Sequence, residues 1–502
     1  MSAHQHGSAP ADVAIVGYGP TGATLANLLG QAGLSVAVFD REAAPLNLPR
    51  AVHFDGEVAR IFQGFGLADE LLPRSRLAQG QKYLNPAGET LLMRKPSNPN
   101  GMHAWPENII FHQPELEDVL RQGVRRYDSV QVNLNTQVDS IDDQGDLVAL
   151  QVQDVRTGHT WTARARWVVA CDGGRSMGRA LVGGGMEDLG LHQPWLVVDV
   201  VMTRDVALPE FTIQHCDPAR PTTYIHAVGP RRRWEIMMMP GDDPESIVED
   251  ASVWRLLAPW IQPGDAELER RAVYTFHALI AHRWQRGRLL LAGDAAHQTP
   301  PFLGQGLCAG ARDAANLAWK LVAVCRGADA SLLDSYTTER RPHVHEFIAT
   351  AVRLGNIIQT TDPKVAAERD QRMREGKDEI VNLSPPLGPG AHGSVAPDGT
   401  TVAQPRLSDG RRLDDAIGPR FALCGPALER NAQTQALWAL IDAGALASID
   451  DPALAGWLAD LGARWIVLRP DRYVLECADN AASLAERLAR WTEVIRLSAP
   501  KD

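Results

Sequence analysis

The first forty residues alternate between short apolar runs and a longer segment with helical periodicity. A β-branched run, DVAIV, occupies residues 12–16, and a second apolar run, SVAVF, occupies residues 35–39. Short apolar runs predict buried strands, whereas the longer periodic segment between them predicts a helix. We therefore expect a strand at 12–16, a helix from about Thr21 to Gln31 with Gly33 at its end, and a strand that leads to Asp40.

Two later apolar runs also end in acids and glycines. WVVA around residue 167 leads to CDGG, and a strand expected at 288–292 leads to Gly293 and Asp294. A helix is predicted from about Leu307, with one apolar face packed inward. The residues that define this face are Ala311, Ala314, Ala318, Leu321 and Cys325.

The middle and C-terminal parts of the chain carry different patterns. Residues 182–271 contain strand-like runs, WLVVDVVM and RWEIMMM, and predict a sheet. The stretch NLSPPLGPGAHGSVAPDGTTVAQP is rich in proline and glycine and predicts a connector. Beyond it, ARWIVLRPDRYVLE predicts two strands joined by a turn, and AASLAERLARWTEVI predicts a closing amphipathic helix.

Composition argues against several functional classes. Hydrophobic residues make up 45% of the chain, and no apolar run approaches the roughly 20 residues of a membrane-spanning helix. The formal net charge of −11 opposes nucleic-acid binding, and the basic run Arg231–Arg233 is too short to reverse it. The six cysteines show no CxxC pair, and the N-terminus lacks a signal-peptide pattern. We expect reduced thiols, no metal site, and a cytoplasmic enzyme that binds small molecules rather than membranes or nucleic acid.

The stretch GYGPTG has the spacing of a dinucleotide-binding turn. Gly17 permits the tight turn, Gly19 lets a pyrophosphate approach the main chain, and Gly22 lets the helix pack on the strand. The helix N-terminus then points at the phosphates. Asp40 lies about 20 residues further on, where an acid accepts hydrogen bonds from a ribose. A purely structural turn is the alternative, and this unit alone does not distinguish NAD from FAD.

The two later strand ends resemble the fingerprints of a known family. CDGG resembles the DG motif of the flavoprotein aromatic hydroxylases, the para-hydroxybenzoate hydroxylase superfamily, and AGDAAH resembles their GD motif. The resemblance implies that Asp172, Gly173 and Arg175 lie near the FAD pyrophosphate and the path of the nicotinamide donor. It also implies that Asp294 binds the ribityl chain of FAD, and a carboxylate suits that polyol because it accepts strong hydrogen bonds from hydroxyls.

Three shorter stretches add to the resemblance. PRAVHFDGEVARIFQGFGL implies that Arg50 contacts the cofactor, and FHQPELEDVL implies the same of Gln113, although either could be a surface group beside a helix. In TPPFLGQGL the prolines stiffen a turn and the glycines admit a flat ring, with the positive end of the next helix beside reduced, anionic flavin. The full set of expected cofactor residues is Gly17, Gly19, Pro20, Thr21, Gly22, Asp40, Arg41, Arg50, Gln113, Asp172, Gly173, Arg175, Asp294, Pro301, Gly304, Gln305, Gly306 and Leu307.

The resemblance covers about residues 11–355. It implies an α/β fold with a Rossmann-like FAD-binding domain, a β-sheet substrate domain and a C-terminal thioredoxin-like domain. The expected divisions are a disordered tail at 1–10, FAD-binding parts at 11–181 and 272–355, the substrate sheet at 182–271, a connector at 356–396 and the thioredoxin-like domain at 397–502. Because this last domain lacks CxxC, we expect a structural or dimer-stabilising role for it, and a homodimer is the expected assembly.

Within the family, the chain is most similar to the 3-(3-hydroxyphenyl)propionate hydroxylases. The resemblance implies FAD-dependent ring hydroxylation of a phenolic acid with NADH or NADPH and O2. Two alternatives stay open. One is an FAD oxygenase of a larger polycyclic or polyketide-like ring, which a wide pocket would favour, and the other is a flavin-binding protein without turnover.

Hydroxylation by this route is expected to use a base or a proton relay that touches the phenol, because a phenolate ring is far more nucleophilic than a phenol with a pKa near 10. The candidates, each of which could instead be a structural group, are His215, Tyr224, His226 and His277. Arg233 could hold a substrate carboxylate or belong to a solvated turn. Met237–Met239 could line an aromatic site, although at least one of them is expected in the core because strand residues alternate between faces.

Overall fold

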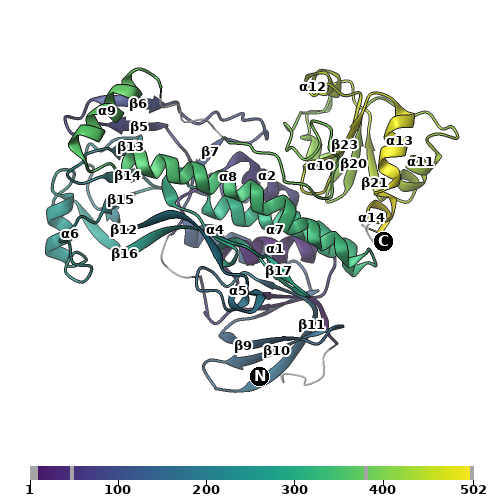
Figure 1. Ribbon diagram of the computed structural model, residues 1–502, viewed down its shortest axis with the longest axis horizontal. Coiled ribbons are helices and arrows are strands. Elements are labelled where there is room, and N and C mark those ends of the chain that lie inside the picture. Colours follow the sequence, from purple (N-terminus) through teal and green to yellow (C-terminus); the bar gives the residue numbers. More distant parts are fainter. Residues whose placement is uncertain (1–8, 46–49, 378–382, 498–502) are drawn as a thin grey trace.

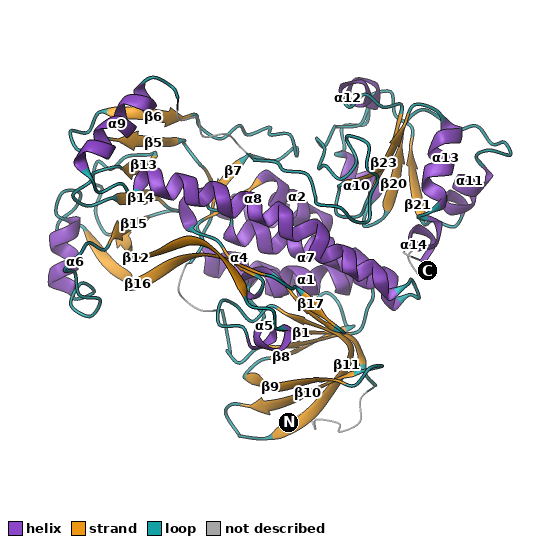
Figure 2. Cartoon of the chain, in the orientation of Figure 1, coloured by secondary structure: helices purple, strands orange, loops and turns teal. Residues whose placement is uncertain are grey.

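The structure, a computed structural model, describes residues 9–45, 50–377 and 383–497. Most of the tail expected at 1–10 therefore lies outside the described residues. Figures 1 and 2 show a mixed α/β molecule with two large sheets, long helices packed beside them, and a separate C-terminal unit that Figure 1 draws in yellow. This arrangement confirms the expected fold class.

The first sheet contains the predicted nucleotide-binding strands. Its strands run in the order β17–β18–β11–β1–β2–β8, while β10 pairs with β11 and β9 pairs with β10. Their bounds are β1 Ala11–Val16, β2 Val36–Phe39, β8 Val130–Asn133, β9 Thr136–Asp143, β10 Val148–Asp154, β11 Thr160–Ala170, β17 Gln285–Arg286 and β18 Leu289–Leu291. Helix α1 (Pro20–Gln31) joins β1 to β2, which lie parallel, and this confirms the predicted strand–helix–strand unit.

The parallel register brings the functional strand ends to one edge of this sheet. Val16, at the end of β1, pairs with Phe39 of β2 and with Ala170 of β11, and Ala170 pairs with Leu291 of β18. The GYGPTG, CDGG and AGDAAH motifs and the acid after β2 therefore leave the sheet side by side. Open α/β sheets form their ligand sites at this carboxyl edge.

The second sheet is formed mainly by the middle of the chain. Its strand order is β19–β16–β12–β15–β14–β13–β5–β6. The bounds are β5 Gln81–Leu84, β6 Thr90–Arg94, β12 Met186–Met202, β13 Thr212–His215, β14 Thr222–His226, β15 Arg231–Met237, β16 Ala266–Ala281 and β19 His297–Gln298. The sheet expected at 182–271 is thus longer than the pattern indicated, because β5 and β6 join it from an earlier part of the chain and β16 continues past residue 271.

The two faces of the second sheet have different environments. Leu196, Trp234 and Ile236 belong to a hydrophobic core on one face, together with Val253 and Leu257 of helix α6 (Asp250–Leu257). The alternate residues of the same strands point to the other face, toward the first sheet. The space between the sheets holds the cavity described below.

The long helix after the GD motif differs from its prediction. Helix α7 (Gly306–Cys325) buries every residue from Cys308 to Val324, so it packs on all sides and not on one face alone. It contacts α1 and helix α8 (Asp334–Ile358), and Trp319 packs against Phe421 of the C-terminal unit. Sequence periodicity missed this because polar residues on its outer side, such as Asp313 and Lys320, are buried in ion pairs.

The C-terminal unit has the thioredoxin-like arrangement. Its sheet order is β21–β20–β22–β23, in which β20 and β21 are parallel and the other pairs antiparallel. The bounds are α10 Leu413–Ile417, β20 Phe421–Cys424, α11 Gln435–Asp442, β21 Leu446–Ile449, α12 Leu454–Asp460, β22 Trp465–Leu468, β23 Val474–Ala478, α13 Ala481–Ala489 and α14 Thr492–Leu497. The closing helix is therefore split in two. Arg60 of helix α2 (Gly56–Gly64) holds the unit in place through a buried ion pair with Asp414 at 2.6 Å.

The other elements surround these layers. They are β3 His53–Asp55, β4 Arg76–Leu77, β7 Asn108–Ile110, α2 Gly56–Gly64, α3 Ala68–Leu71, α4 Gln113–Val124, α5 Met177–Val182 and α9 Pro363–Arg374. Helix α9 lies in the stretch expected to be a connector. All six cysteines are unpaired, and none of the helices in the described part of the chain is long and apolar enough to cross a membrane.

Candidate active site

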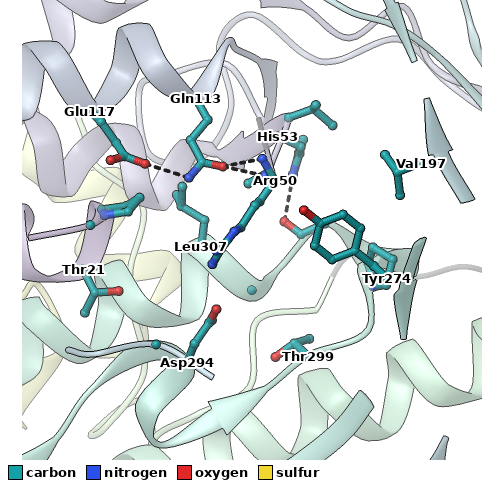
Figure 3. Close-up of a pocket in the computed structure, with 18 of the residues that line it drawn as sticks. Thr21, Arg50, His53, Gln113, Glu117, Val197, Tyr274, Asp294, Thr299 and Leu307 are labelled. Carbon is teal, nitrogen blue, oxygen red and sulfur yellow. Dashed lines mark hydrogen bonds between the residues drawn. The ribbon is translucent and has the colours of Figure 1, made fainter. Parts of the chain in front are cut away.

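A cavity of about 1350 Å³ lies between the carboxyl edge of the first sheet and the inner face of the second. Pockets for a single small ligand usually have volumes of about 300–1,000 Å³. This cavity therefore has room for an extended dinucleotide and a second, smaller molecule. Figure 3 shows side chains around it from the second sheet, from the segments that follow strands of the first sheet and from the start of α7.

The structure brings most of the expected cofactor residues to this cavity. Those that line it are Gly17, Gly19, Pro20, Thr21, Asp40, Arg41, Arg50, Gln113, Asp172, Gly173, Arg175, Asp294, Pro301, Gly304, Gly306 and Leu307. The two that do not are Gly22 and Gln305. A Cβ at Gly22 would lie 2.1 Å from the Gly17 carbonyl oxygen, so Gly22 permits the close helix–strand packing that was expected of it. The Gln305 side chain turns away and donates to Asp55 at 3.1 Å.

Asp40 is held rigidly at the end of β2. Its Oδ2 accepts a hydrogen bond from the Tyr18 main-chain N–H at 2.7 Å, and its Oδ1 accepts from the Glu42 N–H at 2.8 Å. Each carboxylate oxygen can accept more than one hydrogen bond. The acid is thus oriented by the main chain and keeps acceptor capacity for a ribose.

The DG and GD motifs each present a carboxylate oxygen that accepts no hydrogen bond from the described residues. Oδ2 of Asp172 accepts from the Gly178 N–H at 3.1 Å, whereas Oδ1 is buried and has no partner among the described residues. Asp294 is exposed to the cavity, and its loop is fixed by the Gly293 N–H, which donates to buried Asp313 at 3.0 Å. Such acceptors fit a ligand that brings hydroxyl donors, as the ribityl chain of FAD does.

Gln113 is engaged by the protein at both ends of its amide. Its Oε1 accepts from the main-chain N–H groups of Arg50 and Ala51 at 2.8 and 2.7 Å, and its Nε2 donates to Glu117 at 2.7 Å (Figure 3). Gln113 therefore fixes the loop that carries Arg50. Figure 3 shows the Arg50 side chain extending from this loop across the cavity toward Asp294.

The inner face of the second sheet forms the other wall. Gln214, Thr223, Glu235 and Val197 lie in one row across β13, β14, β15 and β12, because these residues pair in register and all line the cavity. Tyr274 of β16 points into the same space (Figure 3), and Phe276 lies two residues further along that strand. Burial raises the pKa of Glu235 above its usual value. Sequence reasoning missed Glu235 and Tyr274, because no motif marks them.

Arg233 does not belong to a solvated turn. It lies in β15, is 1% exposed, and binds Asp199 with Nε and Nη2 at 2.6 and 3.1 Å. Its Nη1 donates to the Arg50 carbonyl oxygen at 2.9 Å. The guanidinium thus joins the sheet to the Arg50 loop. Of the two alternatives for Met237–Met239, an aromatic site or the core, the structure favours the core, because none of the three lines the cavity and Met237 and Met238 are buried.

None of the four residues considered as a base lines the cavity, and this expectation needs correction. Tyr224 donates to the Pro209 carbonyl oxygen at 3.0 Å, His226 lies 3.4 Å from Glu210, and His277 lies 2.7 Å from His192. His215 packs edge-on against Trp260. On β13 and β14, the neighbours of these residues line the cavity instead, because successive strand residues point to opposite faces.

A buried polar network supports the turn after the GD motif. Arg312 of α7 donates to Asp55, Glu57 and Gln305 at distances of 2.6 to 2.9 Å. His53 lies on the cavity side of this network, with Nδ1 3.3 Å from the Gly304 carbonyl oxygen, and burial lowers its pKa. The network fixes the main chain of Gly304–Gly306 where a flat ring would lie. His53, Asp55 and Glu57 of this network belong to the stretch PRAVHFDGEVARIFQGFGL, in which only Arg50 was expected to contact the cofactor.

The comparisons with known proteins agree with this geometry. Residues 10–351 match the family model described as FAD binding domain. The chain is 40% identical over 498 residues to a protein of Rhodococcus jostii (strain RHA1) named probable NADH-specific resorcinol 4-hydroxylase, and the alignment covers 94% of this chain and 93% of the relative. It is 35% identical over 514 residues to the 3-(3-hydroxy-phenyl)propionate/3-hydroxycinnamic acid hydroxylase of Burkholderia cenocepacia (strain HI2424), covering 93% and 94%.

A solved structure shares the fold over almost the whole chain. Aklavinone-11 hydroxylase, solved as a ternary complex with FAD and aklavinone, matches with a TM-score of 0.82 at 22% identity and covers 99% of this chain and 100% of that chain. Fold and site together define a flavoprotein monooxygenase. The chain belongs to the FAD-binding-domain family of flavin-dependent aromatic hydroxylases. When bound, FAD takes electrons from a reduced nicotinamide and supplies the oxygen chemistry with O2.

Proposed function

We propose that the enzyme hydroxylates a single-ring phenol without an acidic side chain, a resorcinol-like substrate, and that its electron donor is NADH. The observation that carries the substrate class is the charge on the inner face of the second sheet. Arg233 and Arg270 approach Asp199 there, and Glu235 lies 3.8 Å from Arg233. The positive charges of these two arginines are balanced by the negative charges of Asp199 and Glu235. A substrate carboxylate at this wall would therefore be a buried charge with no cation left to balance it. NADH is proposed because the Rhodococcus relative is named NADH-specific.

A phenolic acid of the 3-(3-hydroxyphenyl)propionate type is the second candidate. Arg94 and Lys95 line the same cavity at and just beyond the end of β6, away from the Asp199 cluster, and could hold a carboxylate. A larger polycyclic ring is less favoured, because the cavity of about 1350 Å³ must also hold the dinucleotide.

The proposed roles of the cofactor residues follow from their positions around the cavity. We assign the ribose to Asp40, the pyrophosphate to the main chain at Gly19 and the N-terminus of α1, and the ribityl chain to Asp294. The pair Tyr274 and Phe276 is proposed as the aromatic wall of the substrate space. The assembly is proposed to be a homodimer, which sedimentation of the purified protein would test.

The test is a substrate panel on the purified, flavin-loaded protein. Resorcinol, phenol and 3-(3-hydroxyphenyl)propionate are compared for NADH consumption, ring-hydroxylated product and hydrogen peroxide. We expect the uncharged phenols to give about one product per NADH. If the acid is preferred, Arg94→Gln should raise the KM for the acid and leave resorcinol unaffected. Peroxide without hydroxylated product from every phenol would contradict the proposed function.

A further inference from the structure

We propose that Glu235 is the catalytic base that takes the proton from the substrate hydroxyl. This inference rests on the proposed function, because it concerns the same phenol in the same cavity. No motif points to this residue, and its neighbours on β15, Trp234 and Ile236, belong to the core on the opposite face of the sheet.

The position of Glu235 leaves its carboxylate available to a ligand. In the row across the sheet, its neighbours are Val197, which is apolar, and Thr223, whose hydroxyl donates to Gln214 at 2.6 Å. Among the described residues, no group donates a hydrogen bond to the Glu235 carboxylate, and its closest charged contact is the 3.8 Å approach to Arg233. The Glu235 side chain is 12% exposed and lines the cavity, and both of its carboxylate oxygens can accept hydrogen bonds from a ligand.

The charged groups around Glu235 suit a proton acceptor. Those that act on it are Arg233 on the same strand, Asp199 on β12 and Arg270 on β16. Burial raises the pKa of the Glu235 carboxyl, while Arg233 opposes this rise and Asp199 adds to it. Proton transfer from the phenol to a base costs less free energy when the pKa of the base is closer to that of the phenol. A base is also most effective when its pKa is close to the working pH.

The proton transfer conserves charge within the cluster. The substrate O–H bond breaks, its electron pair stays on the phenolate oxygen, and the proton forms an O–H bond with a Glu235 oxygen. The negative charge moves from the carboxylate to the phenolate, so the charge that balances Arg233 is retained. The phenolate ring is then activated for attack, as hydroxylation requires.

The experiment compares Glu235→Gln with the parent enzyme on a phenol that the parent hydroxylates and on its ring-fluorinated analogues. Fluorine lowers the phenol pKa toward neutrality with little change in size, so the most acidic analogue carries its phenolate without a base. We expect Glu235→Gln to lose about 100-fold or more of the hydroxylation rate at pH 7 with the parent phenol, the usual contribution of a positioned base. The loss should shrink to less than about tenfold with the most acidic analogue. The parent enzyme's rate should rise with pH through the Glu235 pKa, and the variant should lack this rise.

The control is Glu267→Gln, which removes the same charge from an exposed position on β16. It should behave as the parent. A loss in Glu235→Gln that is equal for all analogues, with flavin content unchanged, would overturn the assignment and indicate a structural role. Unchanged hydroxylation would overturn it as well. If Glu235→Gln does not retain flavin, Glu235→Asp replaces it, and the same dependence on phenol acidity is required. A parent enzyme that hydroxylates no phenol would instead overturn the proposed function.

Discussion

Two single-methyl changes in the GYGPTG turn should separate cofactor binding from folding. A Cβ at Gly19 would meet no atom within 4 Å, whereas a Cβ at Gly22 would lie 2.1 Å from the Gly17 carbonyl oxygen. Gly22→Ala must therefore displace helix α1 from the end of β1. Such overpacking typically costs about 1–3 kcal/mol of the free energy of unfolding.

Gly19→Ala should leave the unfolding free energy almost unchanged and weaken FAD binding. Gly19 caps α1 with extended backbone angles (φ −73°, ψ −171°) that alanine adopts without strain, so the unfolding free energy of the flavin-free protein should change by less than about 0.5 kcal/mol. The new methyl group would fill the space through which the pyrophosphate reaches the main chain. Losing one hydrogen bond to a charged group costs about 1.5–3 kcal/mol, which corresponds to FAD binding that is roughly 10- to 150-fold weaker.

The assay has two parts for each variant. Urea unfolding of the flavin-free protein gives the stability, and titration with FAD, followed by quenching of flavin fluorescence, gives the affinity. We expect Gly19→Ala to change the affinity alone and Gly22→Ala to change the stability. A Gly19→Ala variant that binds FAD as tightly as the parent would refute the assignment of this turn to the pyrophosphate.

Three further changes test other parts of the structure. Asp294→Ala should reduce FAD retention about tenfold without altering unfolding of the flavin-free protein, because its carboxylate faces the cavity, and flavin content unchanged after gel filtration would contradict the contact. Arg60→Met should lower the unfolding free energy by about 2 kcal/mol in urea, because buried Asp414 loses its charged hydrogen bonds to Arg60 and keeps Arg472, at 3.1 Å, as its remaining cation. The exposed pair of Arg430 and Asp442 gives a control, Arg430→Met, with a cost below about 1 kcal/mol. His277→Ala should keep the amount of product formed per NADH within about twofold of the parent value, because His277 does not line the cavity. A large fall in product per NADH would instead indicate that His277 acts as the base.

Local motifs, together with the family resemblance that they carry, were enough to predict most residues on the proposed cofactor side of the cavity. A strand followed by glycines or an acid is a contiguous signal, and Gly17, Asp172 and Asp294 stand one, two and three residues after the ends of β1, β11 and β18. Parallel pairing then places these strand ends at one edge, so the order of the motifs implied their convergence. Gln113 was also found by its motif, although its contacts place it beneath the Arg50 loop as a support for the main chain.

The substrate side shows where such prediction ends. Alternation along β13 and β14 indicates two faces, but nothing in the sequence says which face meets the cavity. His215, Tyr224 and His226, which were considered as bases, lie on the face away from it. Because the sequence does not say which face of the sheet meets the cavity, it also did not identify Glu235, which is next to the core residue Trp234 in the chain. Arg233 looked like part of a charged turn because its partner, Asp199, comes from a different strand.

The sequence by itself thus determined the fold class, the family and the residues that line the proposed FAD side of the cavity, because strand ends and the loops that follow them are read from neighbouring residues. Only the tertiary structure decided which side chains surround the substrate, how α7 is buried on every side, and which charges cancel. Those properties depend on pairings between β12, β15 and β16, which are far apart in the chain. Since the free energy of a buried charge is set by such partners, its role follows from the packing and not from its own position in the sequence.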